Sequence, residues 1–334
     1  MQCVWRVGWT AWRVIIPAFA FRVDWMDIQK AVSAAADTAR VAAKRGRVAD
    51  YIPQLRELDP DHFGLAVVTL DGREYVDGDV DHPFAIQSIS KVFALILAMR
   101  QCRGESAVQR EIWERVGREP SGDPFNSLVQ LEHECGIPRN PMINAGALVI
   151  ADLLLERCDD PIAEMLTLLA SLTGETVELD PATAAAEEAS SHRNRAMGSL
   201  MAAFDNLHHS IDDVIDIYNR QCSITMTARQ LARAVRFLSN DGIDPLSGST
   251  VLSAPLAKRV MAVMLTCGTY DAAGEFAFSV GLPCKSGVAG GILAAAPDHS
   301  GICAWSPPLD PAGNSLAGRI ALDKLTERLD LSIF

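Results

Sequence analysis

Strand patterns occur near both ends of this 334-residue chain, and a long block of helical periodicity separates them. The apolar run 63–70 precedes Asp71-Gly72 and a second short run at 74–76, which is typical of a β-hairpin. Between Gln87 and Asn240, apolar residues recur at helical spacing in seven segments: 90–101, 107–116, 144–158, 161–173, 195–205, 210–221 and 227–239. We therefore expect this middle block to be all helical.

Strand patterns return in the C-terminal part of the chain. Phe276, Phe278 and Val280 alternate with less apolar residues, which predicts a strand with one buried face. Two further apolar runs, 290–296 and 301–305, are separated by the turn sequence 297–300. An amphipathic helix is predicted over about 317–331.

This order of elements predicts an α+β fold. Strands from the two ends of a chain can share one antiparallel sheet if the helices between them form an insertion. We expect a sheet lobe flanked by helices (about 26–86 and 250–334) and an all-helical lobe (about 87–249), which together form one domain over residues 26–334. A cleft between the lobes is the expected functional site.

Residues 1–25 are interpreted separately because they hold four of the six tryptophans and a short apolar run, 14–21. A secretion signal is one interpretation, since Ala18-Phe19-Ala20 is similar to a signal-peptidase site. We favour the other, an extension ahead of a natural start at Met26, because the run is short and Pro17 interrupts it. We expect this segment to lie outside the fold.

Charge and cysteine usage exclude several classes of function. The chain has 30 Lys and Arg against 42 Asp and Glu, a net charge of −12, so no basic surplus is available for nucleic acid. Its eight cysteines show no C-x-x-C or zinc-site spacing, which indicates free thiols in a reducing compartment and a cytoplasmic protein. No internal apolar run reaches the roughly 18 residues of a membrane span, so no membrane association is expected.

Ser88 and Lys91 lie three positions apart at the start of a predicted helix. At this spacing both side chains face the same way, so the amine of Lys91 can reach the Ser88 hydroxyl. A serine attacks poorly unless a base takes its proton, and a lysine can do so when burial depresses its pKa. The apolar residues that follow, 92–97, would provide that burial. Alone, such a two-position motif is most often a coincidence.

A second motif, Lys285-Ser286-Gly287, lies just before a predicted strand. It resembles the K-[ST]-G element of penicillin-binding proteins and β-lactamases. The glycine lets the strand backbone approach a substrate closely and leaves an N–H free to polarise a carbonyl. A glycine-rich turn into a buried strand would explain the glycines but not the lysine. Together the two motifs predict a serine acyl-transfer enzyme.

Longer segments around these motifs resemble the serine-dependent glutaminase family. They are 87–93 (QSISKVF), 119–127 (EPSGDPFNS), 138–147 (PRNPMINAGA), 218–223 (YNRQCS), 267–271 (CGTYD), 286–291 (SGVAGG) and 305–310 (WSPPLD). The resemblance runs from about Met26 to the C-terminus. It implies a β-lactamase-like fold, a glutaminase catalytic domain over 26–334, and conversion of L-glutamine to L-glutamate and ammonia with no metal or organic cofactor. We also expect a homo-oligomer, a dimer or a tetramer.

The family pattern assigns roles to individual positions. It implies that Ser88 is the nucleophile, that Lys91 is its base, and that Tyr218 and Tyr270 relay protons or hold substrate. The implied substrate contacts are Ser88, Asn144, Glu187, Asn194, Tyr218, Tyr270 and, through its backbone, Val288. Glu187 is chosen over its neighbour Glu188 because its seven-residue step to Asn194 matches the family spacing. Whether Lys91 alone or a lysine–tyrosine pair accepts the first proton stays open.

The chemistry of free glutamine agrees with this assignment. Its α-ammonium needs a carboxylate such as Glu187, and its α-carboxylate needs amide or phenol donors such as Asn144, Asn194 and Tyr218. Taken singly, Asn144 would be interpreted as a helix cap and Asn194 as a turn residue. Arg193 and the pair His208-His209 are interpreted as surface or packing residues.

Two alternatives remain. A penicillin-binding or β-lactamase-type acyltransferase should carry a secretion signal and an S-x-N or Y-x-N element, which Tyr218-Asn219-Arg220 does not match. A non-catalytic amino-acid-binding module should lack the nucleophile, the base or a tyrosine, and all of these are present.

Overall fold

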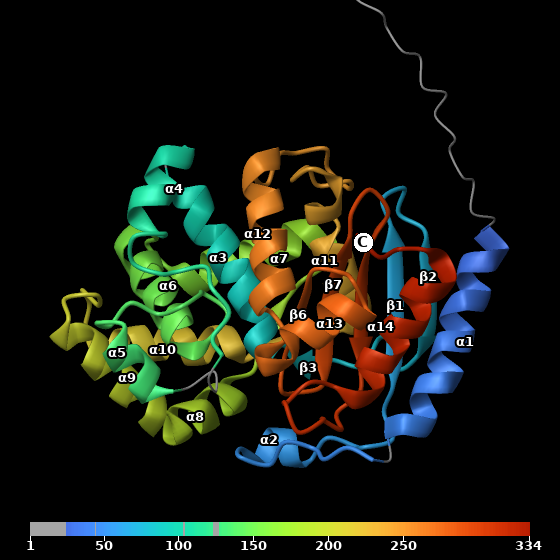
Figure 1. The fold of residues 1–334 in the computed structure, drawn as a ribbon, viewed down its shortest axis with the longest axis horizontal. Coiled ribbons are helices and arrows are strands. Elements are labelled where there is room, and N and C mark those ends of the chain that lie inside the picture. Colours follow the sequence, from blue (N-terminus) through green and yellow to red (C-terminus); the bar gives the residue numbers. More distant parts are fainter. Residues whose placement is uncertain (1–24, 44, 103, 123–126) are drawn as a thin grey trace, which may run out of the picture.

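The computed structural model describes residues 25–43, 45–102, 104–122 and 127–334 (Figure 1). The predicted N-terminal extension lies outside these ranges except for Trp25, with which α1 (Trp25–Ala43) begins. Five strands form an antiparallel sheet in the order β2-β1-β8-β7-β6. They are β2 Glu74–Gly78, β1 Gly64–Thr69, β8 Ser300–Trp305, β7 Gly291–Ala296 and β6 Cys284–Ser286. Because β1 pairs with β8 along its whole length, the sheet unites both ends of the chain, as predicted.

Helices cover both faces of this sheet. On one face lie α1 and α14 (Leu316–Leu329), which pack against each other, and on the other lies α11 (Ala228–Val235). In β1, Leu65 and Val67 join the core under α1 and α14, whereas Ala66 and Val68 join the core shared with the helical lobe. A strand buried on both faces reads as a continuous apolar run, which is why this run shows no alternation.

The helical lobe is organised around α3 (Ser90–Gln101), in which residues 90–99 are all buried. A helix that is apolar all round belongs in the centre of a core. Around it pack α6, α7, α10 and α12. The remaining bounds are α2 Pro53–Arg56, α4 Glu105–Glu111, α5 Leu128–His133, α6 Asn144–Arg157, α7 Pro161–Thr173, α8 Pro181–Ser190, α9 His192–Ala203, α10 Ile211–Cys222, α12 Ala254–Cys267 and α13 Ala273–Ser279, with short 3₁₀ turns at Gln87–Ile89 (η1), Leu238–Asn240 (η2) and Tyr270–Ala272 (η3).

The middle block is not all helical, contrary to the prediction. A second antiparallel sheet has the order β3-β5-β4 and consists of Phe84–Ala85, Ile224–Met226 and Glu178–Leu179. Strands of two or three residues are too short to produce a visible period in the sequence. Their pairing connects the segment just before Ser88 to the segment just after α10.

The predicted strand at 275–280 is also wrong, because this segment forms α13. Phe276 and Val280 are buried, whereas Phe278 is 90% exposed. Two apolar residues four positions apart share one face of a helix as well as one face of a strand, so three alternating residues could not decide between the two. The edge strand of the sheet is β6, a few residues later.

Neither a membrane span nor a disulfide is found in the part of the chain that the structure describes. No helix there is long and apolar enough to cross a membrane. The seven cysteines described are all free, and five of them are buried.

Candidate active site

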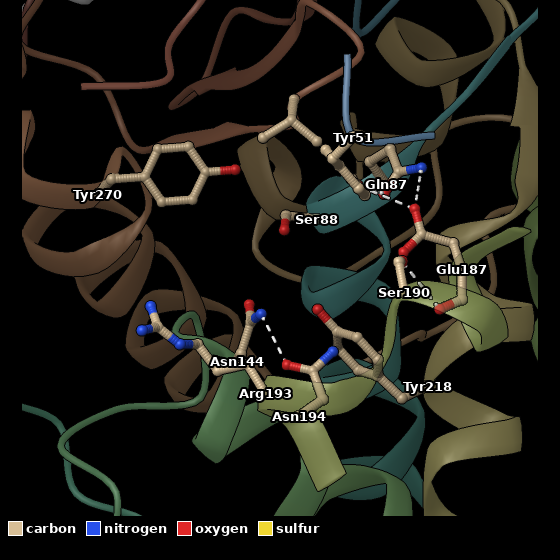
Figure 2. Close-up of a pocket in the computed structure, with 11 residues that line it drawn as sticks. Tyr51, Gln87, Ser88, Asn144, Glu187, Ser190, Arg193, Asn194, Tyr218 and Tyr270 are labelled. Atoms are coloured by element: carbon tan, nitrogen blue, oxygen red, sulfur yellow. Dashed lines mark hydrogen bonds between the residues drawn. The ribbon is translucent and has the colours of Figure 1, made fainter. Parts of the chain in front are cut away.

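A cavity of about 200 Å³ draws its lining from both lobes (Figure 2). It is lined by Tyr51, Gln87, Ser88, Asn144, Glu187, Ser190, Arg193, Asn194, Tyr218, Tyr270 and Val288. All seven residues assigned from the sequence as substrate contacts are in this set. The volume is below the roughly 300–1,000 Å³ of sites for drug-sized ligands, so the cavity suits a small substrate.

Ser88 lies in a sharp turn between β3 and α3. The residue before it, Gln87, has φ 49°, in the left-handed region that residues other than glycine rarely adopt. From there the 3₁₀ turn Gln87–Ile89 runs directly into α3. Ser88 therefore lies at the N-terminus of a helix, where the helix dipole and the backbone N–H groups favour negative charge.

Lys91 lies one turn further along and is 1% exposed. Its Nζ donates to Asn144 Oδ1 at 2.6 Å and to the Met142 carbonyl at 3.4 Å. Burial lowers the pKa of Lys91 to about 8, against the opposing effect of Cys222 and Glu187. At pH 7 roughly a tenth of such a lysine is neutral, compared with roughly 0.03% of an ordinary one. Lys91 is therefore suited to act as a base.

Asn144 and Asn194 join the lysine to the cavity wall. Asn144 is the first residue of α6 and makes no capping bond there, because Ile143 is the N-cap residue. Its Nδ2 donates to Asn194 Oδ1 at 3.1 Å. Asn194 lies within α9 and not in a turn. The structural alternatives for these two residues, a helix cap and a turn, are therefore wrong.

Two buried phenols flank the serine. Figure 2 shows the hydroxyls of Tyr218 and Tyr270 directed towards Ser88. Burial raises the pKa of both tyrosines, and an interaction with the Ser88 side chain opposes the rise at Tyr270. Tyr270 Oη also donates to the Ser286 carbonyl at 3.2 Å. Both phenols are therefore protonated at neutral pH and can donate a proton.

The structure distinguishes Glu187 from Glu188. Glu187 Oε1 faces the cavity and accepts bonds of 2.9 Å from Gln87 Nε2 and Tyr51 Oη (Figure 2). Burial raises the pKa of Glu187, and these two hydrogen bonds oppose the rise. Glu188 instead binds Asn219 Nδ2 at 2.7 Å. Only Glu187 can meet a ligand in the cavity.

Lys285 contacts Tyr270, a residue of the cavity lining. It is buried in β6, and its Nζ donates to the carbonyls of Ser286 at 2.7 Å and Gly268 at 3.0 Å. The same Nζ lies 4.6 Å from the centre of the Tyr270 ring. Beyond β6, the Val288 N–H donates to no acceptor among the described residues. It is therefore free to bind an oxygen of a ligand.

Four lining residues were not predicted as contacts: Tyr51, Gln87, Ser190 and Arg193. Tyr51 is 48% exposed, yet its hydroxyl reaches Glu187, which lies 136 positions away in the sequence. Arg193, interpreted from the sequence as a surface or packing residue, lines the cavity. The one feature of the sequence that could have indicated this location is that Arg193 directly precedes Asn194.

Comparison with known proteins identifies the family. The profile of the Glutaminase family matches residues 46–334. The glutaminase of Methylobacterium sp. (strain 4-46) is 49% identical over 311 residues, which cover 92% of this chain and 99% of that protein. The chain belongs to the glutaminase family. It is an amidohydrolase, and this favours the glutaminase interpretation over a penicillin-binding or β-lactamase-type acyltransferase.

Solved glutaminases share the fold. A structure described as probable glutaminase YbaS has a TM-score of 0.86 at 36% identity and covers 93% of this glutaminase and 99% of its own chain. A structure described as Mglu in its glutamate form has a TM-score of 0.84 at 36% identity and covers 92% of this chain and 69% of its own. These matches confirm the predicted α+β, β-lactamase-like fold.

Proposed function

We propose that this glutaminase hydrolyses the γ-amide of L-glutamine through an acyl-enzyme on Ser88. The observation that carries the proposal is the buried Lys91, which lies one helical turn after Ser88 and donates to Asn144 of the cavity lining. Its pKa of about 8 lets it take a proton near neutral pH. The glutamate form of Mglu supports the substrate class, since glutamate is the product of this reaction.

The cavity offers complementary groups for both ends of free glutamine. The Glu187 carboxylate can pair with the α-ammonium, and a charge-assisted bond of this kind is strong when it is desolvated. Amide and phenol donors of Asn194 and Tyr218 can bind the α-carboxylate. The γ-amide then lies over Ser88, on the side of the cavity where Val288 presents its backbone N–H.

In the acylation step, Lys91 accepts the Ser88 Oγ proton, directly or through a tyrosine, while Oγ bonds to the amide carbon. The oxyanion that forms binds the N–H groups of Ser88 and Val288. When it collapses, the C–N bond breaks and the proton held by Lys91 passes to the leaving nitrogen, which departs as ammonia. The protonated phenols of Tyr218 and Tyr270 can carry this proton.

Deacylation repeats the chemistry with water. Lys91 takes a proton from a water molecule, whose oxygen attacks the γ-glutamyl ester. The ester C–O bond breaks, Ser88 regains a proton and glutamate leaves. Every proton that is taken up is returned, so the residues present suffice for the reaction.

The test is ammonia release from L-glutamine by the full chain, with Ser88→Ala and with L-asparagine as comparisons. We expect turnover that falls by at least roughly 10³-fold in the variant, while glutamate still raises the melting temperature of both proteins. Undiminished turnover in Ser88→Ala would overturn the serine mechanism. Binding of glutamate without turnover by the native chain would support the amino-acid-binding module.

Two further properties complete the proposal. The free thiols of the described cysteines support a cytoplasmic location. The homo-oligomer, a dimer or a tetramer, stays a prediction that light scattering can test.

A further inference from the structure

We propose that Trp305 is a positioning residue that holds the Ser88 and Val288 N–H groups at the separation that the oxyanion requires. The inference rests on the function proposed above. Trp305 is the last residue of β8, is fully buried and does not line the cavity. Its contacts nevertheless reach both segments that carry an oxyanion donor.

The first contact is with the segment that carries Val288. The Trp305 indole Nε1 donates to the Ala289 carbonyl at 3.0 Å, one residue beyond Val288. This segment is a tight turn between β6 and β7, closed by the Gly287 N–H to Gly291 carbonyl bond of 2.8 Å. The indole N–H therefore fixes the Ala289 carbonyl, and with it the turn in which the neighbouring Val288 presents its own N–H.

The second contact is with the segment that carries Ser88. The Trp305 ring stacks on Phe84 with centroids 4.9 Å apart and planes 2° apart. Phe84 begins β3, four residues before Ser88. A Cβ added to Gly291, the β7 residue opposite Trp305, would lie 2.9 Å from the Phe84 ring and 2.8 Å from Ile89 Cδ1. The start of β7 is thus packed directly against Phe84, four residues before Ser88, and Ile89, the residue after it.

The sheet provides the space that the indole occupies. Trp305 is paired with Gly64 in β1 and with Gly291 in β7, so neither neighbouring strand places a side chain beside it. On the outer side, His82 and His62 stack on the ring with centroid distances of 5.1 and 5.2 Å. Held by these contacts, the ring has little freedom to move away from Ala289.

The position of these donors matters because an oxyanion hole is selective for the transition state. Donors must lie about 2.7–3.1 Å from the oxyanion, and loss of one donor typically lowers kcat by roughly 10²–10³. A displaced donor weakens binding of the oxyanion and leaves binding of the substrate almost unchanged. Loss of the indole bond should therefore lower kcat and spare KM.

The test is Trp305→Phe in the full chain, which keeps an aromatic ring against Phe84 and removes the indole N–H. We expect kcat for glutamine to fall about 10-fold or more, with KM and the glutamate-induced thermal shift within about twofold of the native values. Trp113→Phe is the matched control, because it makes the same change at a buried tryptophan whose ring contacts Arg118, away from the segments that carry Ser88 and Val288. It should leave kcat unchanged.

A second replacement, Trp305 by 3-benzothienylalanine, keeps the bicyclic shape and lacks only the N–H donor. It should lower kcat like Trp305→Phe, and it decides the question if the phenylalanine variant does not fold. An unchanged kcat in a folded variant, or a rise in KM at constant kcat, would overturn the positioning role. If the native chain, measured in parallel, does not hydrolyse glutamine, the proposed function fails first, and the role proposed for Trp305 fails with it.

Discussion

Replacing Lys91 by methionine should stabilise the fold at neutral pH while it abolishes turnover. Lys91 is buried, and burial lowers its pKa from 10.5 to about 8. When folding lowers the pKa of a base, the protonated form of that base lowers the stability of the folded state. Methionine is similar in length and has no charge, so Lys91→Met removes that cost.

The magnitude follows from the pKa. Near pH 7 the lysine is mostly protonated in both the folded and the unfolded state. The cost is then close to the full difference between 10.5 and about 8, or about 3 kcal/mol of unfolding free energy. The variant also removes the donor to Asn144 Oδ1, and an unsatisfied buried acceptor costs roughly 1–3 kcal/mol. We expect a net gain of between about 0 and 2 kcal/mol.

The pH dependence has a definite sign. Between about pH 8 and pH 10.5 the unfolded chain binds the Lys91 proton and the folded chain releases it. The stability of the native protein relative to Lys91→Met therefore rises with pH through this window. Above about pH 10.5 Lys91 is neutral in both the folded and the unfolded state. The two proteins then differ only by the hydrogen bond from Lys91 to Asn144, so the native protein becomes the more stable of the two.

The assay is equilibrium urea unfolding of both proteins at about pH 7, 8, 9 and 10. Lys30→Met serves as the control, because the Lys30 side chain is 72% exposed and its replacement should change stability little at any of these pH values. A stability difference that does not vary with pH would refute the argument from the buried ammonium. Unchanged glutamine turnover in Lys91→Met would remove the lysine from the mechanism.

Three further predictions concern the same site. The value of kcat/KM should rise with pH and level off above about pH 8, because Lys91 must be neutral to act; a pH–rate profile that is flat between about pH 6 and 9 would contradict this. Glu187→Gln should raise KM for glutamine about 10- to 100-fold with a smaller effect on kcat, since it removes the charge that meets the α-ammonium; steady-state kinetics with an unchanged KM would exclude that contact. Gly146→Ala should lower the unfolding free energy by at least about 2 kcal/mol, because its Cβ would lie 1.9 Å from the Asn140 carbonyl, whereas Gly274→Ala, with no atom within 4 Å of the new methyl, should cost nothing in thermal unfolding.

Predictions from the sequence were most successful where structure depends on local pattern. The hairpin of β1 and β2, the strands β7 and β8, and the helix α3 that carries Lys91 all follow from runs or periods that neighbouring residues define. The strand predicted at 275–280 failed because six residues fit both periods. Only tertiary packing, which buries Phe276 and leaves Phe278 exposed, decides for the helix.

The sequence predicted the residues of the candidate site that the family pattern includes, but not the cavity residues outside that pattern. The family pattern identified seven residues that the fold brings to one cavity. It did not identify Tyr51, because the phenol reaches the site through contacts with Gln87 and Glu187, which lie 36 and 136 positions away. Contacts of this kind depend on how two lobes pack, and no local spacing records them.

The pairing of β1 with β8 has a consequence for synthesis of the chain. About 230 residues separate the two strands, so a ribosome that adds roughly 5–20 residues per second needs roughly 10–50 s to produce β8 after β1. During that interval the hairpin of β1 and β2 has an open edge, and an open edge is a template for pairing with other chains. The amount of active enzyme that a cell obtains therefore depends on how well this edge is protected before the last 35 residues of the chain emerge, and not only on the stability of the finished fold.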